Sequence, residues 1–157
     1  GPSELLISEI QYHAADATDS GDWIEVHNPG TNAVNLNGWI LRDADDTHAF
    51  ALPNQLLQPG ASLVLCEEGS KFRLYHAVTV PVAGSFDFGL NNSGDTLRLY
   101  RPIGTLALAI TYDDVAPWPA QADGTGYTLQ LISKQSDPTL PASWRVSPNL
   151  GGNPGQF

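Results

Sequence analysis

The chain has 157 residues with 7 basic and 17 acidic side chains, which gives a formal net charge of −10 at pH 7. This charge opposes binding to nucleic acid or anionic membranes, because phosphate groups are held by clustered Lys and Arg. No apolar run reaches the roughly 20 residues of a membrane-spanning helix, so no membrane insertion is expected. Cys66 is the only cysteine, which excludes an internal disulfide.

The chain is long enough for one domain with its own core, and no repeat or change in composition divides it. Gly1-Pro2 is typical of the remnant of a cleaved purification tag. We therefore expect residues 3–157 to be a single monomeric domain taken from a longer protein. Its core would span about residues 4–112, followed by a C-terminal extension over about 113–157.

Short segments rich in Val, Ile, Leu, Thr and aromatic residues alternate with clusters of Gly, Pro, Asn and Asp, which predicts an antiparallel all-β sandwich. Residues 71–76 fit a short helical turn. From residue 138 onward the composition predicts an extended tail anchored by Trp144. In chain order, the predicted strands are 5–12, 23–27, 38–43, 48–51, 62–66, 96–101, 106–112 and 128–132.

The stretch GDWIEVHNPGTNAVNLNGWIL, residues 21–41, alternates apolar and polar residues on both sides of an Asn-Pro-Gly sequence. This pattern predicts a strand with Ile24 and Val26 facing the core, followed by a turn. The strand that carries Trp39 and Leu41 is expected to return beside the first one.

Several motifs occur in the order and spacing of a known family: SEI at residues 8–10, WIEVHNP at 23–29, VNLNGWIL at 34–41 and FGLNNSGDTLRLYRPIG at 88–104. In these the chain resembles the lamin tail domain, in the version found in bacterial secreted proteins. The segments ITYDDVAPWPAQADGTGYTLQLI and SWRVSPNLGGNPG are similar to the closing part of bacterial members. The resemblance implies an immunoglobulin-like antiparallel β-sandwich with an extended C-terminal tail.

The resemblance also implies an accessory role, because bacterial members are attached to secreted or surface proteins and their motif contains no catalytic residue. We expect a non-catalytic interaction, adhesion or spacer module of a larger bacterial secreted or cell-surface protein, located outside the cell. Its partners would be other domains of that protein, a cell-surface protein or a polysaccharide. The alternatives are a metal-dependent hydrolase domain and a carbohydrate-binding module.

Motifs for catalysis are missing from the sequence. The four histidines are far apart, with no H-E-x-x-H pattern. Asp113 and Asp114 are adjacent, and adjacent side chains of an extended chain point to opposite faces. No G-x-S-x-G nucleophile motif is present.

A metal site is the one candidate with named ligands: Glu9, Asp22 and Glu25. The first two strands are expected to lie side by side, which would bring Glu9 and Glu25 together. Two carboxylates repel each other unless a cation or a proton lies between them. Ca²⁺ is the expected ion because the candidate ligands are oxygens. In the alternative interpretation, Arg42 or Arg98 supplies the charge, or the two glutamates are simply exposed on the solvent face.

Aromatic residues offer a second candidate site. A shared face for Tyr12, Trp39, Trp118 and Trp144 would form a platform for carbohydrate, whereas core packing is the alternative. Trp118 lies between two prolines, which favours a role in fixing an extended segment.

Overall fold

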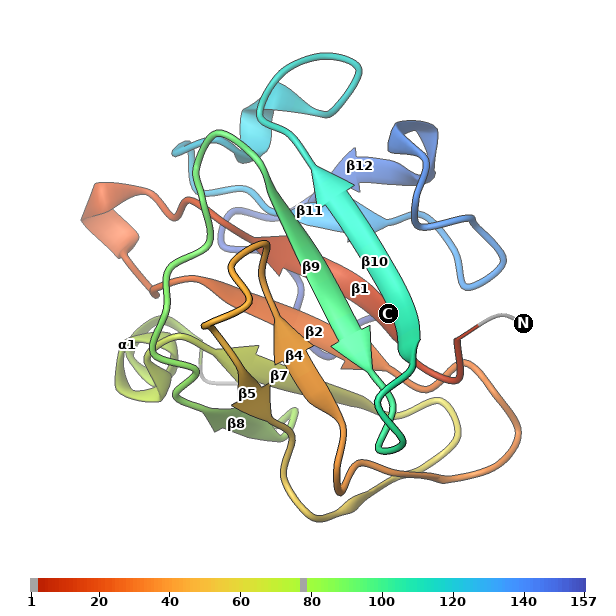
Figure 1. Cartoon of the computed structure of the whole chain (residues 1–157). Coiled ribbons are helices and arrows are strands. Elements are labelled where there is room, and N and C mark those ends of the chain that lie inside the picture. The colour runs from red at the N-terminus through yellow and green to blue at the C-terminus, as the bar shows by residue number, and fades with distance from the viewer. Residues whose placement is uncertain (1–2, 77–78) are drawn as a thin grey trace.

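The computed structural model describes residues 3–76 and 79–157, so the interpretation of Gly1-Pro2 as a tag remnant lies outside the described residues. The chain folds into an immunoglobulin-like sandwich of two main β-sheets, which confirms the all-β prediction (Figure 1). One sheet has the order β12-β11-β1-β2-β7-β8 and the other the order β10-β9-β4-β5. All pairs in the two sheets are antiparallel except β7 with β8.

Each of the eight predicted strand segments overlaps a strand, because alternation and turn chemistry coincide there. The corresponding strands are β1 (Leu6–Gln11), β2 (Trp23–His27), β4 (Ile40–Arg42), β5 (Phe50–Ala51), β7 (Ser62–Cys66), β9 (Asp95–Tyr100), β10 (Leu106–Tyr112) and β11 (Leu129–Leu131). The strands that were not predicted are short: β3 (Val34–Asn35), β6 (Leu56–Leu57), β8 (Val82–Gly84) and β12 (Trp144–Val146). The predicted helical turn corresponds to α1 (Gly69–Tyr75).

The strand that carries Leu41 does not return beside β2, so that prediction was wrong. β2 pairs with β1 and β7, whereas β4 pairs with β5 and β9 in the other sheet. After the Asn-Pro-Gly turn the chain crosses between the sheets, and the Asn28 amide fixes this crossing by donating 2.9 Å hydrogen bonds to the carbonyls of Asn32 and Leu57. Side-chain alternation specifies which residues face the core but not which sheet receives a strand.

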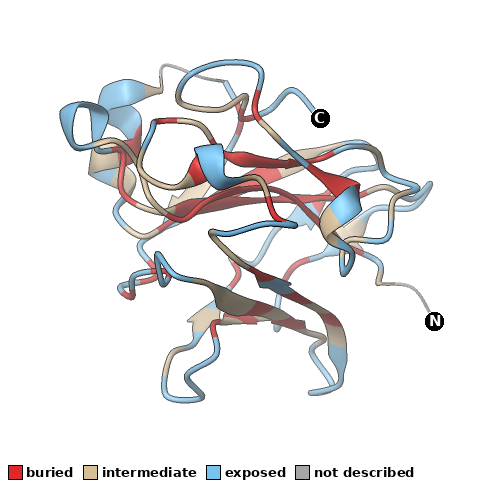
Figure 2. Ribbon diagram, turned by 90° about the horizontal axis from the view of Figure 1, so that it is seen from above, coloured by how far each residue is buried: buried red, intermediate tan, exposed pale blue. Residues whose placement is uncertain are grey.

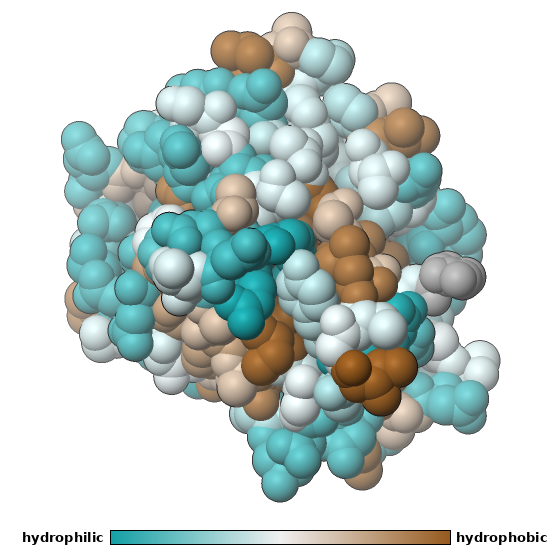
Figure 3. Space-filling model, viewed as in Figure 1, coloured by the Kyte–Doolittle hydropathy of each residue, from teal (hydrophilic) through white to brown (hydrophobic). Residues whose placement is uncertain are grey.

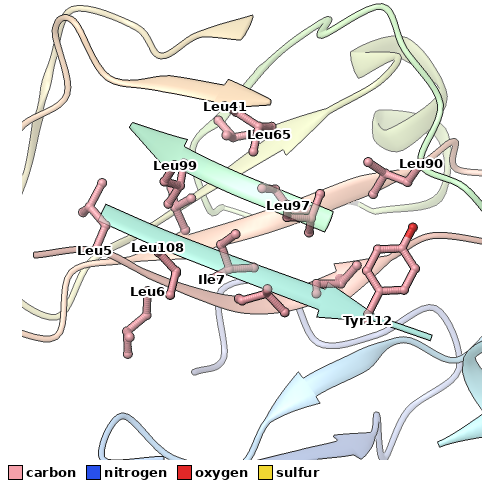
Figure 4. Close-up of a cluster of buried hydrophobic side chains, with 14 of the residues drawn as sticks. Leu5, Leu6, Ile7, Leu41, Leu65, Leu90, Leu97, Leu99, Leu108 and Tyr112 are labelled. Atoms are coloured by element: carbon pink, nitrogen blue, oxygen red, sulfur yellow. The ribbon is translucent and has the colours of Figure 1, made fainter. Parts of the chain in front are cut away.

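Between the two sheets lies the main core, to which Ile24 and Val26 contribute as predicted. Leucines from both sheets meet there (Figure 4). Tyr12 stacks on Tyr112 with ring centroids 4.7 Å apart. A second, smaller cluster lies on the outer side of the six-stranded sheet, where Trp23 packs against Phe72 of α1. Within the described residues, no helix is long and apolar enough to cross a membrane.

The C-terminal extension adds two strands to the six-stranded sheet. β11 pairs with the free edge of β1, with Glu9 opposite Gln130, and β12 pairs with β11. Trp144 is 4% exposed, and its ring centroid lies 6.1 Å from that of Trp118. The last residues then run along the outer side of this sheet, where the C-terminus lies (Figure 2).

Candidate functional site: a buried carboxylate pair

Glu9 and Glu25 lie opposite each other on β1 and β2, as predicted from the sequence. The register shifts between Ile7 and Glu9, so both Ser8 and Glu9 lie against Glu25. Such a bulge turns successive side chains away from strict alternation. The two glutamates are 2% and 0% exposed, which is rare for carboxyl groups without a compensating partner.

Neutral donors surround the Glu9 carboxyl group. Its Oε2 atom accepts hydrogen bonds from Thr128 Oγ1 at 2.6 Å, from the backbone N–H of Asn153 at 2.8 Å and from Gln130 Nε2 at 3.3 Å. All three donors belong to the C-terminal extension.

The Glu25 carboxyl group is held in the same way. Ser8 Oγ donates to Oε1 at 2.7 Å and the backbone N–H of Gly155 donates to Oε2 at 2.5 Å. Two backbone N–H groups of one segment, two residues apart, therefore contact the two carboxyl groups: that of Asn153 contacts Glu9 and that of Gly155 contacts Glu25.

An arginine bridge or simple solvent exposure was the alternative to a metal at this pair. Burial of both glutamates contradicts exposure, and the positions of the arginines contradict the bridge. Arg98 donates to the carbonyl of Asp43 and pairs with Asp46 at 2.8 Å, while Arg42 donates to the carbonyl of His48. Both arginines belong to the four-stranded sheet. Among the described residues, neither glutamate forms an ion pair with a basic side chain.

Burial dominates the titration of the pair. Loss of water, together with the neighbouring charge of Glu25, raises the pKa of Glu9 to about 7, against the lowering effect of its hydrogen bonds to Thr128 and Asn153. Burial also raises the pKa of Glu25. A carboxyl group in such surroundings binds a proton more tightly than in water.

Asp22 does not join this pair. Side chains alternate along a strand, and the inward-facing Ile24 places Asp22 on the opposite side of the sheet from Glu25. Its Oδ2 atom accepts a 2.7 Å hydrogen bond from the backbone N–H of Leu90, and burial raises its pKa to about 7. No three His, Cys, Asp or Glu side chains of residues 3–76 and 79–157 converge as metal ligands.

A cavity of about 550 Å³ borders the carboxylate pair. The cavity is lined by acidic, basic and aromatic side chains, among them Glu9, Glu25, His27, Lys134, Arg145 and Phe157. The rings of His27 and Phe157 meet edge to face, with centroids 4.8 Å apart.

The predicted aromatic platform for carbohydrate is wrong, because its four side chains are buried. Tyr12, Trp39, Trp118 and Trp144 are 0%, 3%, 7% and 4% exposed, so they pack in the core and cannot present their faces to a sugar. Cys66 is also buried, and burial raises the pKa of its thiol to about 12, which leaves almost no thiolate at neutral pH.

Residues 1–114 match the model of the Lamin Tail Domain family, and the chain belongs to this family. The family is an immunoglobulin-like, non-catalytic domain that often has interaction or structural roles. No curated protein matches the chain. The matched residues contain both glutamates, whereas Thr128, Gln130 and the two backbone donors lie beyond them. Sequence reasoning missed these donors, for which the only signal is a second Asn-Pro-Gly sequence at residues 153–155.

Proposed function

We propose that this domain is a non-catalytic interaction module of a larger bacterial secreted or cell-surface protein, and that it binds an extended segment of a protein partner along β10. The observation that carries the proposal is that β10 is an unprotected edge strand. β10 is seven residues long, has the sequence LALAITY without a charged residue or a proline, and lies at the edge of its sheet. Proteins usually protect such edges with charges, prolines or short strands, because unpaired backbone groups attract another strand.

The sheet face next to β10 is uncovered as well. Figure 2 shows the four-stranded sheet with its outer side open, whereas α1 and the C-terminal segment lie outside the other sheet. Small side chains occupy β10 on this side, with Ala109 beside Arg98 and Thr111 beside Thr96. Figure 3 shows hydrophilic and apolar side chains mixed on this face.

The charges on this face favour a partner with acidic side chains. Arg42 and Arg98 are opposite each other on β4 and β9, so two of the seven basic residues of an acidic chain lie together. Asp46, which pairs with Arg98, has an 85% exposed side chain and is easily displaced. A strand of the partner added to β10 would lie about 5 Å from β10. Because the side chain of Ala109 is only a methyl group, an acidic side chain of that added strand has room to approach Arg98.

Replacement of the domain within its parent protein tests this function. We expect the parent to lose attachment to its partner or to the cell surface when residues 3–157 are exchanged for an unrelated β-sandwich of similar length. Full attachment after the exchange would show that the domain is only a spacer and would contradict the proposal.

A further inference from the structure

The last residues of the chain are seated in a groove on the outer side of the six-stranded sheet. We call residues 151–157 the C-terminal strap. The Gly151 N–H donates to the carbonyl of Gly126, the Asn153 side chain accepts from Gln130 Nε2 at 3.0 Å, and Phe157 reaches His27. The strap therefore passes from β11 over β1 to β2.

The groove recognises the strap mainly through its backbone. The Asn153 and Gly155 N–H groups, two residues apart, donate to Glu9 and Glu25. Gly152 has a φ of +84°, and a Cβ atom there would overlap Glu9 Oε2 and lie 2.7 Å from Thr128 Cγ2. The groove therefore requires a glycine at this position and two N–H groups at a fixed spacing, which is a defined peptide specificity.

Pro154 is the one buried residue of the strap, whereas Gly155, Gln156 and Phe157 are exposed, so the strap is bound with little apolar burial beyond this proline. Cavities of about 550 and 650 Å³ flank the strap, the second one next to Val80, Pro154 and Leu56. Segments with few buried contacts detach locally at a low free-energy cost. When the strap detaches, two glutamates without a basic partner lose their backbone donors and become available to another peptide.

We propose that this groove is a peptide-binding site, which the strap fills within its own chain and which the strap of a second copy of the protein can fill in its place. Exchange of identical segments between copies needs no new contacts, because the incoming segment makes the hydrogen bonds already present. The proposal is independent of β10, which lies in the other sheet.

Binding of a synthetic strap peptide tests the proposal. In the variant Gly152→Val of the 157-residue chain the chain's own strap cannot seat, and the groove is left open. We expect the fluorescently labelled peptide Gly-Gly-Asn-Pro-Gly-Gln-Phe to bind this variant at least tenfold more tightly than it binds the wild-type protein. The same peptide with valine in its second position should not bind.

Two further variants keep the test decisive. Gly104, in the turn between β9 and β10, also has a positive φ with nothing within 4 Å of its Cβ position, so Gly104→Val reproduces the backbone strain away from the groove and should leave peptide binding at the wild-type level. If Gly152→Val does not fold, Gly155→Val replaces it, because a Cβ there would lie 3.1 Å from Val80 Cβ. A folded strap variant that binds neither peptide, or binds both equally, would overturn the proposal.

Discussion

Glu9 and Glu25 are neighbours across β1 and β2, and each accepts a hydrogen bond from a different backbone N–H of the same C-terminal segment. The pair thereby links the part of the chain that matches the family to the extension that follows it. Two buried carboxyl groups without a basic partner also connect the stability of the fold to pH.

Stability should fall as the pH rises from about 4.5 to 7. The pKa of Glu9 is 4.5 in its ordinary state and about 7 in the fold, so the folded state binds the proton more tightly. Protonation of Glu9 therefore contributes at most about 3 kcal/mol to the free energy of unfolding. This stabilisation is fully present below pH 4.5, decreases between pH 4.5 and 7, and is lost above pH 7.

Comparison of Glu9→Gln with the wild type isolates the contribution of Glu9. Burial lowers the pKa of His27 and His76, so these two histidines make the stability of both proteins rise with pH in the acidic range. Urea unfolding at pH 4.5, 6 and 8 should show that the free energy of unfolding of Glu9→Gln increases relative to that of the wild type as the pH rises. The exposed Glu4, which pairs with Arg101, is the control: its pKa is lowered, so Glu4→Gln should show no such gain. Parallel pH profiles for wild type and Glu9→Gln would refute the assignment.

Trp144→Ala should destabilise the domain by about 3–5 kcal/mol, the usual cost of removing a buried aromatic side chain. Leu150, in the same extension, is 62% exposed, and Leu150→Ala should change the melting temperature little. Truncation after Tyr112 should be more damaging still, since it removes β11, β12, the three donors to Glu9 and the Gly155 donor to Glu25. A truncated domain that melts within a degree or two of the full chain would mean that the extension is dispensable.

Calcium should stabilise the domain by much less than the roughly 2.7 kcal/mol expected from a specific site at a hundredfold excess over its Kd, so the melting temperature should change little. Hydrogen-bond donors already occupy oxygens of Glu9, Glu25 and Asp22, and an ion would have to replace them. Thermal melts in millimolar Ca²⁺ and in chelator measure the difference. A large shift that disappears in Glu9→Gln or Asp22→Asn would instead support the calcium site expected from the sequence.

Cys66 should not react with a thiol reagent in the native protein, because its side chain is buried and its pKa is raised. Ellman's reagent should modify it only at the rate of unfolding. Rapid modification of the folded domain would indicate that the cluster around Trp23 opens in solution.

The sequence was most informative where local chemistry decides the structure. The alternation around Ile24 and Val26 identified β2 and its inward face, and the position of Glu9 within β1 predicted its meeting with Glu25. The path of the chain after Asn28 was not predictable in this way, since alternation is the same whichever sheet a strand joins. The donors from Asn153 and Gly155 depend on contacts 130 and more residues apart, and the Asn-Pro-Gly sequence that contains them indicates a turn but not the residues it contacts.

The most direct measurement of the central claim is the attachment of the parent protein to its partner or cell surface after charges are placed on β10. Ala109→Glu and Thr111→Glu add carboxylates to the open side of the edge strand, where they repel a partner with acidic side chains, whereas Ile103→Glu adds one to the adjacent turn, where residue 103 is 82% exposed. If β10 is the binding edge, the first two variants lose at least tenfold in binding with unchanged melting temperatures, and Ile103→Glu binds like the wild type. Wild-type binding by all three folded variants would contradict the claim that this domain recognises its partner through β10.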